Sequence, residues 1–414
     1  MLDINKIRNN TEEIKTSLLK RMDFVDLESI IKLDDERKDI VTEVDKLKAE
    51  ANKIAKGGKP TPEAIEQGKK LREQIKELDE KLNSVDSKLK EKLGELPNIV
   101  ADDVIAGDKD KNEVIKTYGK KQEFKFEPKD HVELATMHGL IDYERAAKMS
   151  GAGFWAYTGK GADLEWALLN YFVDFHRKNK YKFLLLPYLL TEKSAYTSGH
   201  LPKFREDLFW TEDKLCLNAT SEMMLGNFHR EEILPEEDLP IKYYSYSSCF
   251  RREAGAYRTE ERGMIRGHQF NKIEMFHFTK PEDSWKAFDE LVSNAEKLVE
   301  GLGLHFNSVK LAAKDCSAAM AKTIDLEVYI PSMKGYKEVS SISNALDYQA
   351  RRGSIRYKDS KTGKNEFVHT LNASGLATSR LLPAILEQNQ QEDGSIKIPK
   401  VLQKYCGFKK IELK

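Results

Sequence analysis

Residues 28–96 constrain the fold more than any other part of the chain, because their apolar side chains follow a spacing that only paired long helices can bury. This stretch is dense in Lys, Glu and Asp and contains no aromatic residue. Its apolar residues recur at alternating steps of three and four, which is the heptad pattern of a coiled coil. The two runs, interrupted at Arg37 and Gly68, are Ile30, Leu33, Ile40, Val44, Leu47, Ala51 and Ile54, and then Ala64, Leu71, Ile75, Leu78, Leu82, Val85 and Leu89.

A break between the two runs predicts a hairpin. Residues 57–62 read GGKPTP, a sequence that cannot continue a helix. Two long helices joined by a short turn fold back on each other. We therefore expect an antiparallel hairpin over residues 27–96, with helices about 45 Å long at about 1.5 Å per residue. Such an arm has no core of its own and must project from another domain.

The remaining chain has the composition of a large folded domain. Aromatic residues are frequent from about residue 131 onward, and short β-rich runs alternate with helical patterns such as Leu164–Arg177. We expect an α+β fold in two domains, an arm domain at 1–110 and a larger domain at 111–414. A chain of 414 residues that is 40% hydrophobic and 33% charged is too apolar for a disordered protein and too charged for a membrane bundle.

Charge, apolar runs and cysteines exclude further classes. The 68 basic and 68 acidic residues balance, which argues against a polycation that coats nucleic acid but leaves room for a local basic patch. The longest apolar run, Phe183–Leu190, is broken by Pro187 and is too short to span a membrane. The four cysteines form no CxxC pair, which predicts reduced thiols in a cytoplasmic protein and neither a zinc knuckle nor a disulfide framework.

The turn of the expected hairpin is more basic than the rest of the arm. Between residues 53 and 72, only Glu63 and Glu66 oppose six basic residues, namely Lys53, Lys56, Lys59, Lys69, Lys70 and Arg72. A charge run of this kind is typical of a solvated helical surface. It also fits a tip that contacts phosphates at the end of a long reach.

The range Ile241–Phe278 predicts two strands joined by a loop. In the first strand, Ser245, Ser247 and Cys249 share a small polar face that ends in Arg251 and Glu253, and the alternate residues form an aromatic face expected to be core. In the second strand, a single face carries Phe270, Lys272 and Glu274, with the first and last about 13 Å apart. That face could hold a long ligand. Glu274 taken alone could equally be a buried ion-pair partner.

These strands carry a family resemblance. The sequences FRREAG and RGMIRGHQFNKIE resemble motif 2 of class II aminoacyl-tRNA synthetases, and HQFxKxE resembles the version in seryl-tRNA synthetases. Lys182–Phe204, with Pro187, looks like motif 1. Leu217–Glu222 resembles the threonine-x-glutamate loop for serine. Lys322–Glu327, Glu338–Asn344, Gln349–Arg352 and Thr370–Arg380 look like the motif 3 region, so the resemblance covers essentially the full chain.

The resemblance implies a fold, a reaction and partners. The fold would be a long N-terminal helical hairpin plus a class II catalytic domain, built on an antiparallel β-sheet flanked by helices. The reaction would activate L-serine with ATP, giving seryl-adenylate and pyrophosphate, and would then transfer serine to the 3′ end of tRNA(Ser), and of tRNA(Sec) where the organism has one. The implied enzyme is cytoplasmic, is not a membrane protein, forms a homodimer through motif 1 and uses Mg²⁺.

The resemblance also implies roles for individual residues. Arg251, at the α-phosphate, and Arg380, at the γ-phosphate, would be the catalytic residues. Glu338 and Ser341 would hold Mg²⁺, although their spacing of three requires a bulge or the end of a strand. The ATP set is Arg251, Arg252, Glu253, Phe270, Glu338, Val339, Ser340, Ser341 and Arg380. The serine set is Thr220, Ser221, Glu222, Arg251, Glu274, Asn372 and Ser374. The tRNA set is Lys53, Lys56, Lys59, Lys69, Lys70 and Arg72.

Two segments depart from the family pattern, and two other readings stay open. The motif 2 loop, usually close to AGxxGRDTRG, reads AGAYRTEERG here, with the change at residues 258–261, and Ala313–Ser317 replaces a segment that usually reads TGDMG. The first alternative is a synthetase-like ligase that loads an amino acid onto a carrier protein, although that group lacks the long arm and uses zinc ligands. The second is a non-catalytic coiled-coil protein that retains a synthetase fold.

Overall fold

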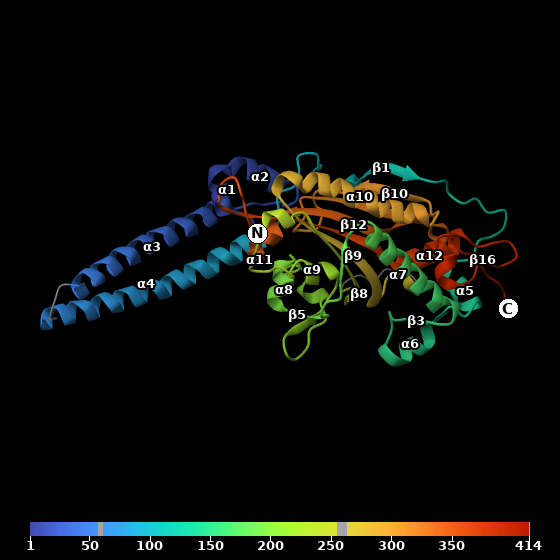
Figure 1. Cartoon of the computed structure of the whole chain (residues 1–414), viewed down its shortest axis with the longest axis horizontal. Coiled ribbons are helices and arrows are strands. Elements are labelled where there is room, and N and C mark those ends of the chain that lie inside the picture. Colours follow the sequence, from blue (N-terminus) through green and yellow to red (C-terminus); the bar gives the residue numbers. More distant parts are fainter. Residues whose placement is uncertain (57–60, 255–262, 414) are drawn as a thin grey trace. The chain divides into compact units, whose positions relative to one another are not determined.

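The chain forms two compact units (Figure 1). The computed structural model describes residues 1–56, 61–254 and 263–413. The first unit is Met1–Ile99 and the second is Val100–Lys414. The boundary expected at residue 110 therefore falls inside the second unit.

The first unit consists of helices. Its members are α1 (Ile4–Asn9), α2 (Thr11–Leu19), α3 (Leu27–Lys56) and α4 (Pro62–Glu95). Helices α3 and α4 run side by side in opposite directions, which confirms the predicted hairpin (Figure 1). Helix α4 begins as the sequence dictates, because the Thr61 side chain accepts a hydrogen bond from the Ala64 N–H at 3.2 Å and Pro62 occupies the first turn.

Apolar contacts between α3 and α4 follow the predicted seam. Ile40 and Val44 of α3 and Val85 of α4 form a buried cluster. Ion pairs flank it, including Arg37 Nε to Asp86 Oδ1 at 2.7 Å. Exposed pairs of this type contribute little stability, so the apolar contacts of the seam supply most of the stability of the hairpin.

The second unit is built on a sheet of eight strands in the order β1-β10-β11-β12-β15-β9-β8-β4. Every neighbouring pair is antiparallel except β4 and β8, which are parallel. The strands are β1 (Glu113–Tyr118), β4 (Lys182–Leu184), β8 (Ile241–Phe250), β9 (Gln269–Thr279), β10 (Phe306–Lys310), β11 (Lys322–Ile330), β12 (Gly335–Leu346) and β15 (His369–Ala377).

Helices α7 (Lys160–Lys178), α10 (Ser284–Gly301) and α12 (Thr378–Gln388) lie against this sheet (Figure 1). The other helices are α5 (His131–Met137), α6 (Tyr143–Ser150), α8 (Glu192–Thr197), α9 (Ser221–Leu225), α11 (Tyr348–Gly353) and α13 (Gln403–Cys406). Small strands complete the unit, namely β2 (Ile141–Asp142), β3 (Ala156–Tyr157), β5 (Leu189–Thr191), β6 (Leu215–Leu217), β7 (Ile233–Leu234), β13 (Arg356–Lys358), β14 (Asn365–Phe367), β16 (Ile396–Lys397) and β17 (Lys410–Ile411). No helix among the described residues is long and apolar enough to cross a membrane.

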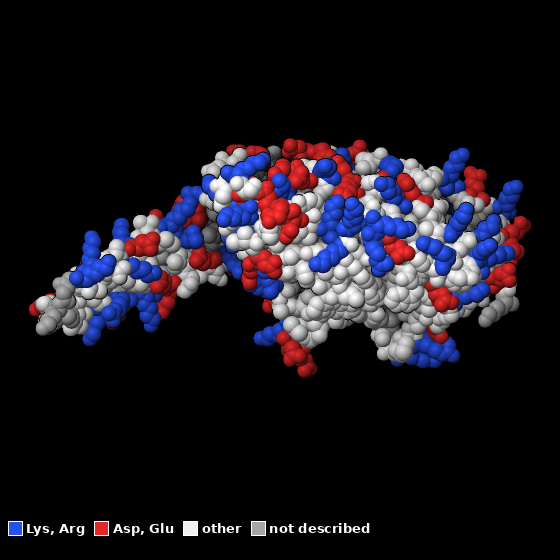
Figure 2. Space-filling view, viewed as in Figure 1, with Lys and Arg blue, Asp and Glu red and all other residues white. Residues whose placement is uncertain are grey.

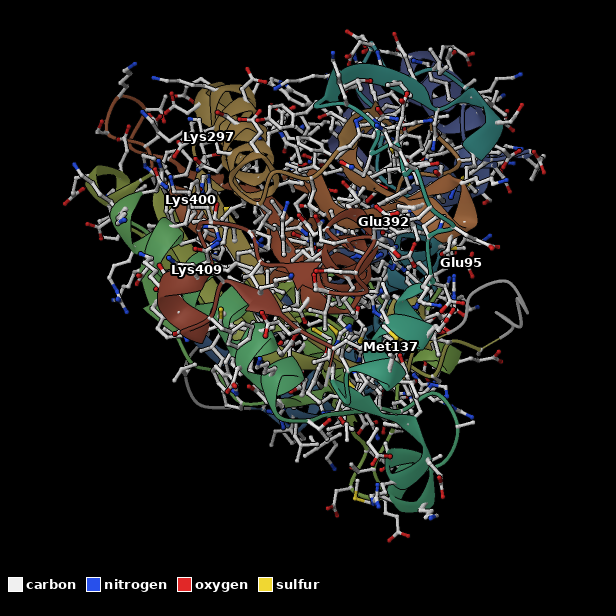
Figure 3. The ribbon with its side chains drawn as sticks, turned by 90° about the vertical axis from the view of Figure 1, so that its right-hand side faces the viewer. Glu95, Met137, Lys297, Glu392, Lys400 and Lys409 are labelled. Atoms are coloured by element: carbon white, nitrogen blue, oxygen red, sulfur yellow. The ribbon has the colours of Figure 1, made fainter. Side chains whose placement is uncertain are left out.

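The core lies between the sheet and its helices. In β11, the alternate residues Ile324, Leu326 and Val328 join the buried cluster that includes Phe172 of α7 and Phe288 of α10. The outer faces of the helices are polar or exposed, as at Lys297 of α10 and Met137 of α5 (Figure 3). The apolar face of the sheet therefore packs against the core. The polar residues that alternate with the apolar ones along each strand lie on the opposite face.

Both faces of β8 are largely buried. The small polar face is fully buried at Ser245, Ser247 and Cys249. On the aromatic face only Tyr244 is fully buried, and Tyr246 and Phe250 are half-buried. Tyr244 belongs to the core cluster and Tyr246 packs against it, as predicted for the aromatic face, but the small polar face is buried as well.

Two glycine substitutions should move stability in opposite directions. A Cβ at Gly161, near the start of α7, would lie 2.0 Å from the Leu140 carbonyl oxygen, whereas a Cβ at Gly68 in α4 meets nothing within 4 Å. Gly161→Ala should lower the free energy of unfolding of the second unit by about 1–3 kcal/mol. Gly68→Ala should raise that of the arm by about 0.5–1 kcal/mol. Urea unfolding followed by circular dichroism measures both, and a neutral Gly161→Ala would contradict the close approach.

Candidate active site

A cavity of about 760 Å³ opens on the polar face of the large sheet. Its wall combines strand ends with the loop before α9 and the N-terminal turn of α12, so segments far apart in sequence meet there. Of the residues predicted for ATP and serine, the cavity wall contains Thr220, Glu222, Arg251, Glu253, Glu274, Glu338, Ser341, Asn372, Ser374 and Arg380. The predicted groups are thus brought together in one place.

Two guanidinium groups are held by backbone carbonyls in this wall. Arg251 Nε donates to the Ala219 carbonyl at 3.2 Å, and the Arg251 guanidinium lies 5.2 Å from the centroid of the Phe270 ring. Arg380 donates through Nη1 to the Glu338 carbonyl at 2.9 Å. Fixed, permanently charged forks of this kind suit phosphate oxygens.

Five of the predicted residues do not present a free side chain to the cavity. Ser221 shares a hydrogen bond of 2.7 Å with Ser247, and Ser340 Oγ donates to the Ser374 carbonyl at 2.5 Å. Val339 is buried, and Arg252 is exposed outside the wall. Phe270 faces the Arg251 guanidinium.

Glu253 lies in the wall in a strained conformation. Its φ is +50°, in the left-handed region that a non-glycine residue rarely adopts. Its Oε2 accepts from Arg266 Nη1 at 2.5 Å. Strain held by an ion pair is typical of a functional position.

A β-bulge brings Glu338 and Ser341 to the same face of β12. The register with β11 shifts between Leu326 and Glu327, so Ser340 faces Leu326 whereas Glu338 faces Glu327. Val339 is the extra residue. The bulge that the spacing required is present, and both oxygen-bearing side chains line the cavity.

The bulge faces two acidic residues of β11. Asp325 pairs with Ser341 and Glu327 with Glu338. Burial, and then the charge of Glu338, raise the pKa of Asp325 well above its usual range, and its buried Oδ1 accepts no hydrogen bond within the described part of the chain. Within the same ranges, no three His, Cys, Asp or Glu side chains form a metal site. The wall therefore offers oxygen donors, the ligand type that hard divalent cations prefer.

The inner end of the cavity contains two carboxyl groups and an ammonium group. Glu222 Oε1 accepts from Gln349 Nε2 at 2.7 Å. Burial, followed by the charge of Glu274, raises the pKa of Glu222 to about 7. Glu274 Oε1 accepts from Asn372 Nδ2 at 3.1 Å, and Lys272 Nζ lies 2.6 Å from Glu274 Oε2. Glu274 is thus both a buried ion-pair partner and part of the cavity wall.

Several wall residues were not assigned a role from the sequence. Lys272 could have been, because strand alternation placed it between Phe270 and Glu274. Asp325 had the same signal, because it alternates with Ile324 and Leu326 in β11, whereas His200 comes from a segment without one. Burial and the charges of Arg251 and Lys272 lower the pKa of His200 to about 3, so this wall residue is neutral. Of the departures from the family pattern, Lys314–Ser317 joins the wall, and residues 258–261 lie outside the described residues.

The basic residues predicted for tRNA belong to the first unit. Lys53 and Lys56 end α3, and Lys69, Lys70 and Arg72 lie in α4, all exposed. Lys59 lies outside the described residues. Figure 2 shows basic side chains all along this hairpin, interspersed with acidic ones.

The comparisons with known proteins define the class first. Residues 206–389, which include most of the cavity wall, match the family model of the tRNA synthetase class II core domain (G, H, P, S and T). The second unit is a class II aminoacyl-tRNA synthetase core.

The arm and the full-length relatives then define the family. Residues 1–100 match the seryl-tRNA synthetase N-terminal domain. Serine–tRNA ligase 2 of Clostridium acetobutylicum is 53% identical, covering 99% of this chain and 100% of its own. The seryl-tRNA synthetase of Pyrococcus horikoshii, solved with ATP, has a TM-score of 0.93 at 35% identity, covering 100% of both chains. The cytoplasmic enzyme of Naegleria fowleri, solved with AMP, has a TM-score of 0.88 at 31% identity, covering 100% of this chain and 99% of its own. The chain belongs to the seryl-tRNA synthetase family.

The raised pKa of Glu222 predicts a pH dependence. Below pH 7 the carboxyl group of the free pocket is protonated and cannot pair with the ammonium of an amino acid. The kcat/KM for the amino acid in the first half-reaction should rise about tenfold per pH unit up to about pH 7 and then level off. The Glu222→Gln variant should have a low kcat/KM for the amino acid, and this value should not rise with pH in the same range. ATP–pyrophosphate exchange between pH 5.5 and 8.5 measures both, and an identical slope in the variant would assign it to another group.

Proposed function

We propose that this chain is a serine–tRNA ligase that activates L-serine with ATP and transfers the seryl group to tRNA(Ser). The observation that carries the proposal is the pairing, in a single cavity, of two buried carboxyl groups, Glu222 and Glu274, with two guanidinium groups, Arg251 and Arg380. The first pair suits an amino acid with an ammonium and a hydroxyl group, and the second suits a triphosphate. Charging of tRNA serves protein synthesis, so we place the enzyme in the cytoplasm.

The chemistry needs positioning and charge stabilisation and no protein nucleophile. The serine carboxylate attacks the α-phosphorus, the bond to the bridging oxygen breaks, and pyrophosphate leaves with the electron pair. Arg251 would stabilise charge on the α-phosphate and Arg380 on the γ-phosphate. Phe270 and Glu253 would bind adenine, by stacking and by accepting from its amino group, which requires Arg251 and Arg266 to share these partners with ATP.

The amino-acid end would be selected by hydrogen bonding. Glu222, beside Thr220, would receive the serine ammonium. Glu274, with Asn372 and Ser374, would bind the hydroxyl group. A buried acceptor left unpaired by alanine rejects that amino acid, and discrimination of this kind reaches about 10⁴–10⁵.

Glu338 and Ser341 would hold the divalent metal that the family uses, and we propose Mg²⁺. Bound there, the ion would neutralise phosphate charge during the reaction. Arg380 supports this placement, since its Nη1 lies 3.5 Å from Glu338 Oε2 and 2.9 Å from the Glu338 carbonyl and so orients that residue.

The acceptor is best explained as tRNA. The match of residues 1–100 to the seryl-tRNA synthetase N-terminal domain disfavours a ligase that acts on a carrier protein. We propose that Lys53, Lys56, Lys59, Lys69, Lys70 and Arg72 contact tRNA phosphates. The proposed acceptors are tRNA(Ser) and, in an organism that has one, tRNA(Sec).

We also propose a homodimer through the edge strand β4 and its surroundings. Leu185 is 70% exposed and Trp166 is 57% exposed. Phe183 and Leu189, which lie close to Leu185 in sequence, are exposed as well. Phe183 stacks on Tyr244 and Trp166 lies against Tyr246, so these residues cover one region of β8. An open sheet edge with large apolar side chains favours an interface between copies.

The proposed function predicts one active amino acid. In ATP–pyrophosphate exchange across the standard amino acids, serine should be the best substrate, because its hydroxyl group satisfies Glu274, which an amino acid such as alanine leaves unpaired. Charging of total tRNA with labelled serine should follow. Efficient activation of another amino acid would contradict the assignment of the pocket, and exchange without charging would contradict the acceptor.

Shortening the arm should separate the two half-reactions. Lys48 Nζ lies 3.9 Å from Asp79 Oδ1 across the hairpin, so residues 49–77 can be replaced by a short Gly/Ser turn that keeps the Ile40, Val44 and Val85 cluster. Exchange should stay within about twofold, whereas kcat/KM for tRNA should fall about 100-fold or more, the equivalent of about 2.7 kcal/mol. An equal loss of exchange activity and of kcat/KM for tRNA would show that the arm is needed for the chemistry in the cavity.

A charge at Leu185, directly after β4, should dissociate the dimer. The wild-type chain should sediment at twice the 47.5 kDa of one chain. Leu185→Asp should sediment near 47.5 kDa, because burying a carboxylate in an apolar interface costs several kcal/mol. Leu413→Asp, at another exposed leucine, is the control and should stay dimeric. A monomeric wild-type chain would refute the proposal.

A further inference from the structure

Lys272 of β9 is the lysine that the second unit buries most deeply within the described ranges, and it lies in the wall of the cavity. A lysine is almost never buried unless it is paired, because its ammonium loses its hydration. Lys272 belongs to neither the ATP set nor the serine set. Its contacts show what its charge does there.

The Lys272 ammonium contacts three groups, each from a different element. Nζ donates to Thr220 Oγ1 at 2.6 Å and to Ser374 Oγ at 3.4 Å, and it lies 2.6 Å from Glu274 Oε2. The strand register explains the meeting, since Ser374 of β15 faces Glu274 of β9. All three partners line the cavity.

The contact with Glu274 supplies charge without using up the carboxylate. Oε1 accepts from Asn372 Nδ2, and Lys272 Nζ lies 2.6 Å from Oε2. A carboxylate oxygen can accept further donors. Lys272 therefore compensates the charge of Glu274 while Oε2 keeps the capacity to accept from a hydroxyl group.

The contact with Thr220 fixes the direction of a hydroxyl group. Thr220 Oγ1 accepts from Lys272 Nζ and also from the Glu222 N–H at 3.3 Å. A hydroxyl oxygen has two lone pairs and one proton. With both lone pairs engaged, Thr220 can only donate to a further partner in the cavity.

We propose that Lys272 is a specificity-determining positioning residue of the amino-acid pocket, which compensates Glu274 and orients the hydroxyl group of Thr220 so that the pocket favours serine over alanine. The inference rests on the proposed serine function. It assigns to Lys272 a role in selection that a merely structural ion pair would not have, because a structural pair would affect serine and alanine alike.

The test compares Lys272→Met with Lys242→Met in ATP–pyrophosphate exchange. Both substitutions remove an ammonium from an ion pair on neighbouring strands, but Lys242 pairs with Glu290 of α10 outside the cavity wall. For Lys272→Met we expect KM for serine to rise about 30-fold or more and the serine-to-alanine ratio of kcat/KM to fall about tenfold or more. KM for ATP should change less than about threefold. The control should retain wild-type values.

The outcomes separate this inference from the proposed function. A wild-type chain that fails to activate serine would overturn the function. Wild-type activation of serine with an unchanged serine-to-alanine ratio in Lys272→Met would overturn only the role of Lys272, as would equal increases in KM for serine and for ATP.

A second variant decides the matter if Lys272→Met does not fold. Lys272→Gln retains N–H donors for Thr220 and Ser374 but has no charge to compensate Glu274. Its melting temperature is checked against the wild-type chain by circular dichroism. A lowered serine-to-alanine ratio in this variant supports the inference, and a wild-type ratio overturns it.

Discussion

The period-two alternation of the central sheet is the constraint on which the rest of the second unit depends. In β11 it directs Ile324, Leu326 and Val328 to the helices, and Asp325 and Glu327 to the cavity. A slip of one residue would put both carboxyl groups into the core. Packing of α7, α10 and α12 on the apolar face therefore specifies the register, and the register in turn fixes the positions of the charged groups on the other face.

Several ionisable groups of the charged face are held by neighbouring side chains. Glu222 is held by Gln349, Glu274 by Lys272 and Asn372, and Glu338 by Arg380. A buried charge without a partner costs several kcal/mol, which is a large part of the stability of a domain. The contacts that keep the fold stable are thus the same contacts that hold the site in place, and a site fixed in this way loses little energy in reorganisation when it stabilises charge.

Alternation and heptad spacing could be read from the sequence, whereas long-range pairing could not. The spacing predicted the α3–α4 hairpin, and alternation placed Phe270, Lys272 and Glu274 on one face. His200 reaches the cavity wall, and Gln349 reaches Glu222, through tertiary contacts that leave no local pattern. The bulge at Val339 shows a second limit. Nothing local fixes where an extra residue enters a strand, and that insertion decided that Ser341 would face the cavity and Ser340 would not.

The net charge of the chain is zero, but charged residues have different roles in the two units. In the arm, ion pairs such as Arg37–Asp86 are exposed and contribute little, so the hairpin depends on the seam of Ile40, Val44 and Val85. The stability of the arm therefore depends little on its surface charges, so these charges can be distributed to suit a partner. In the cavity the reverse holds for a buried charge such as Glu274, which is paired with Lys272. An excess of lysines near the end of the arm can thus change with little effect on folding, whereas a single ammonium at Lys272 is fixed by three contacts at once.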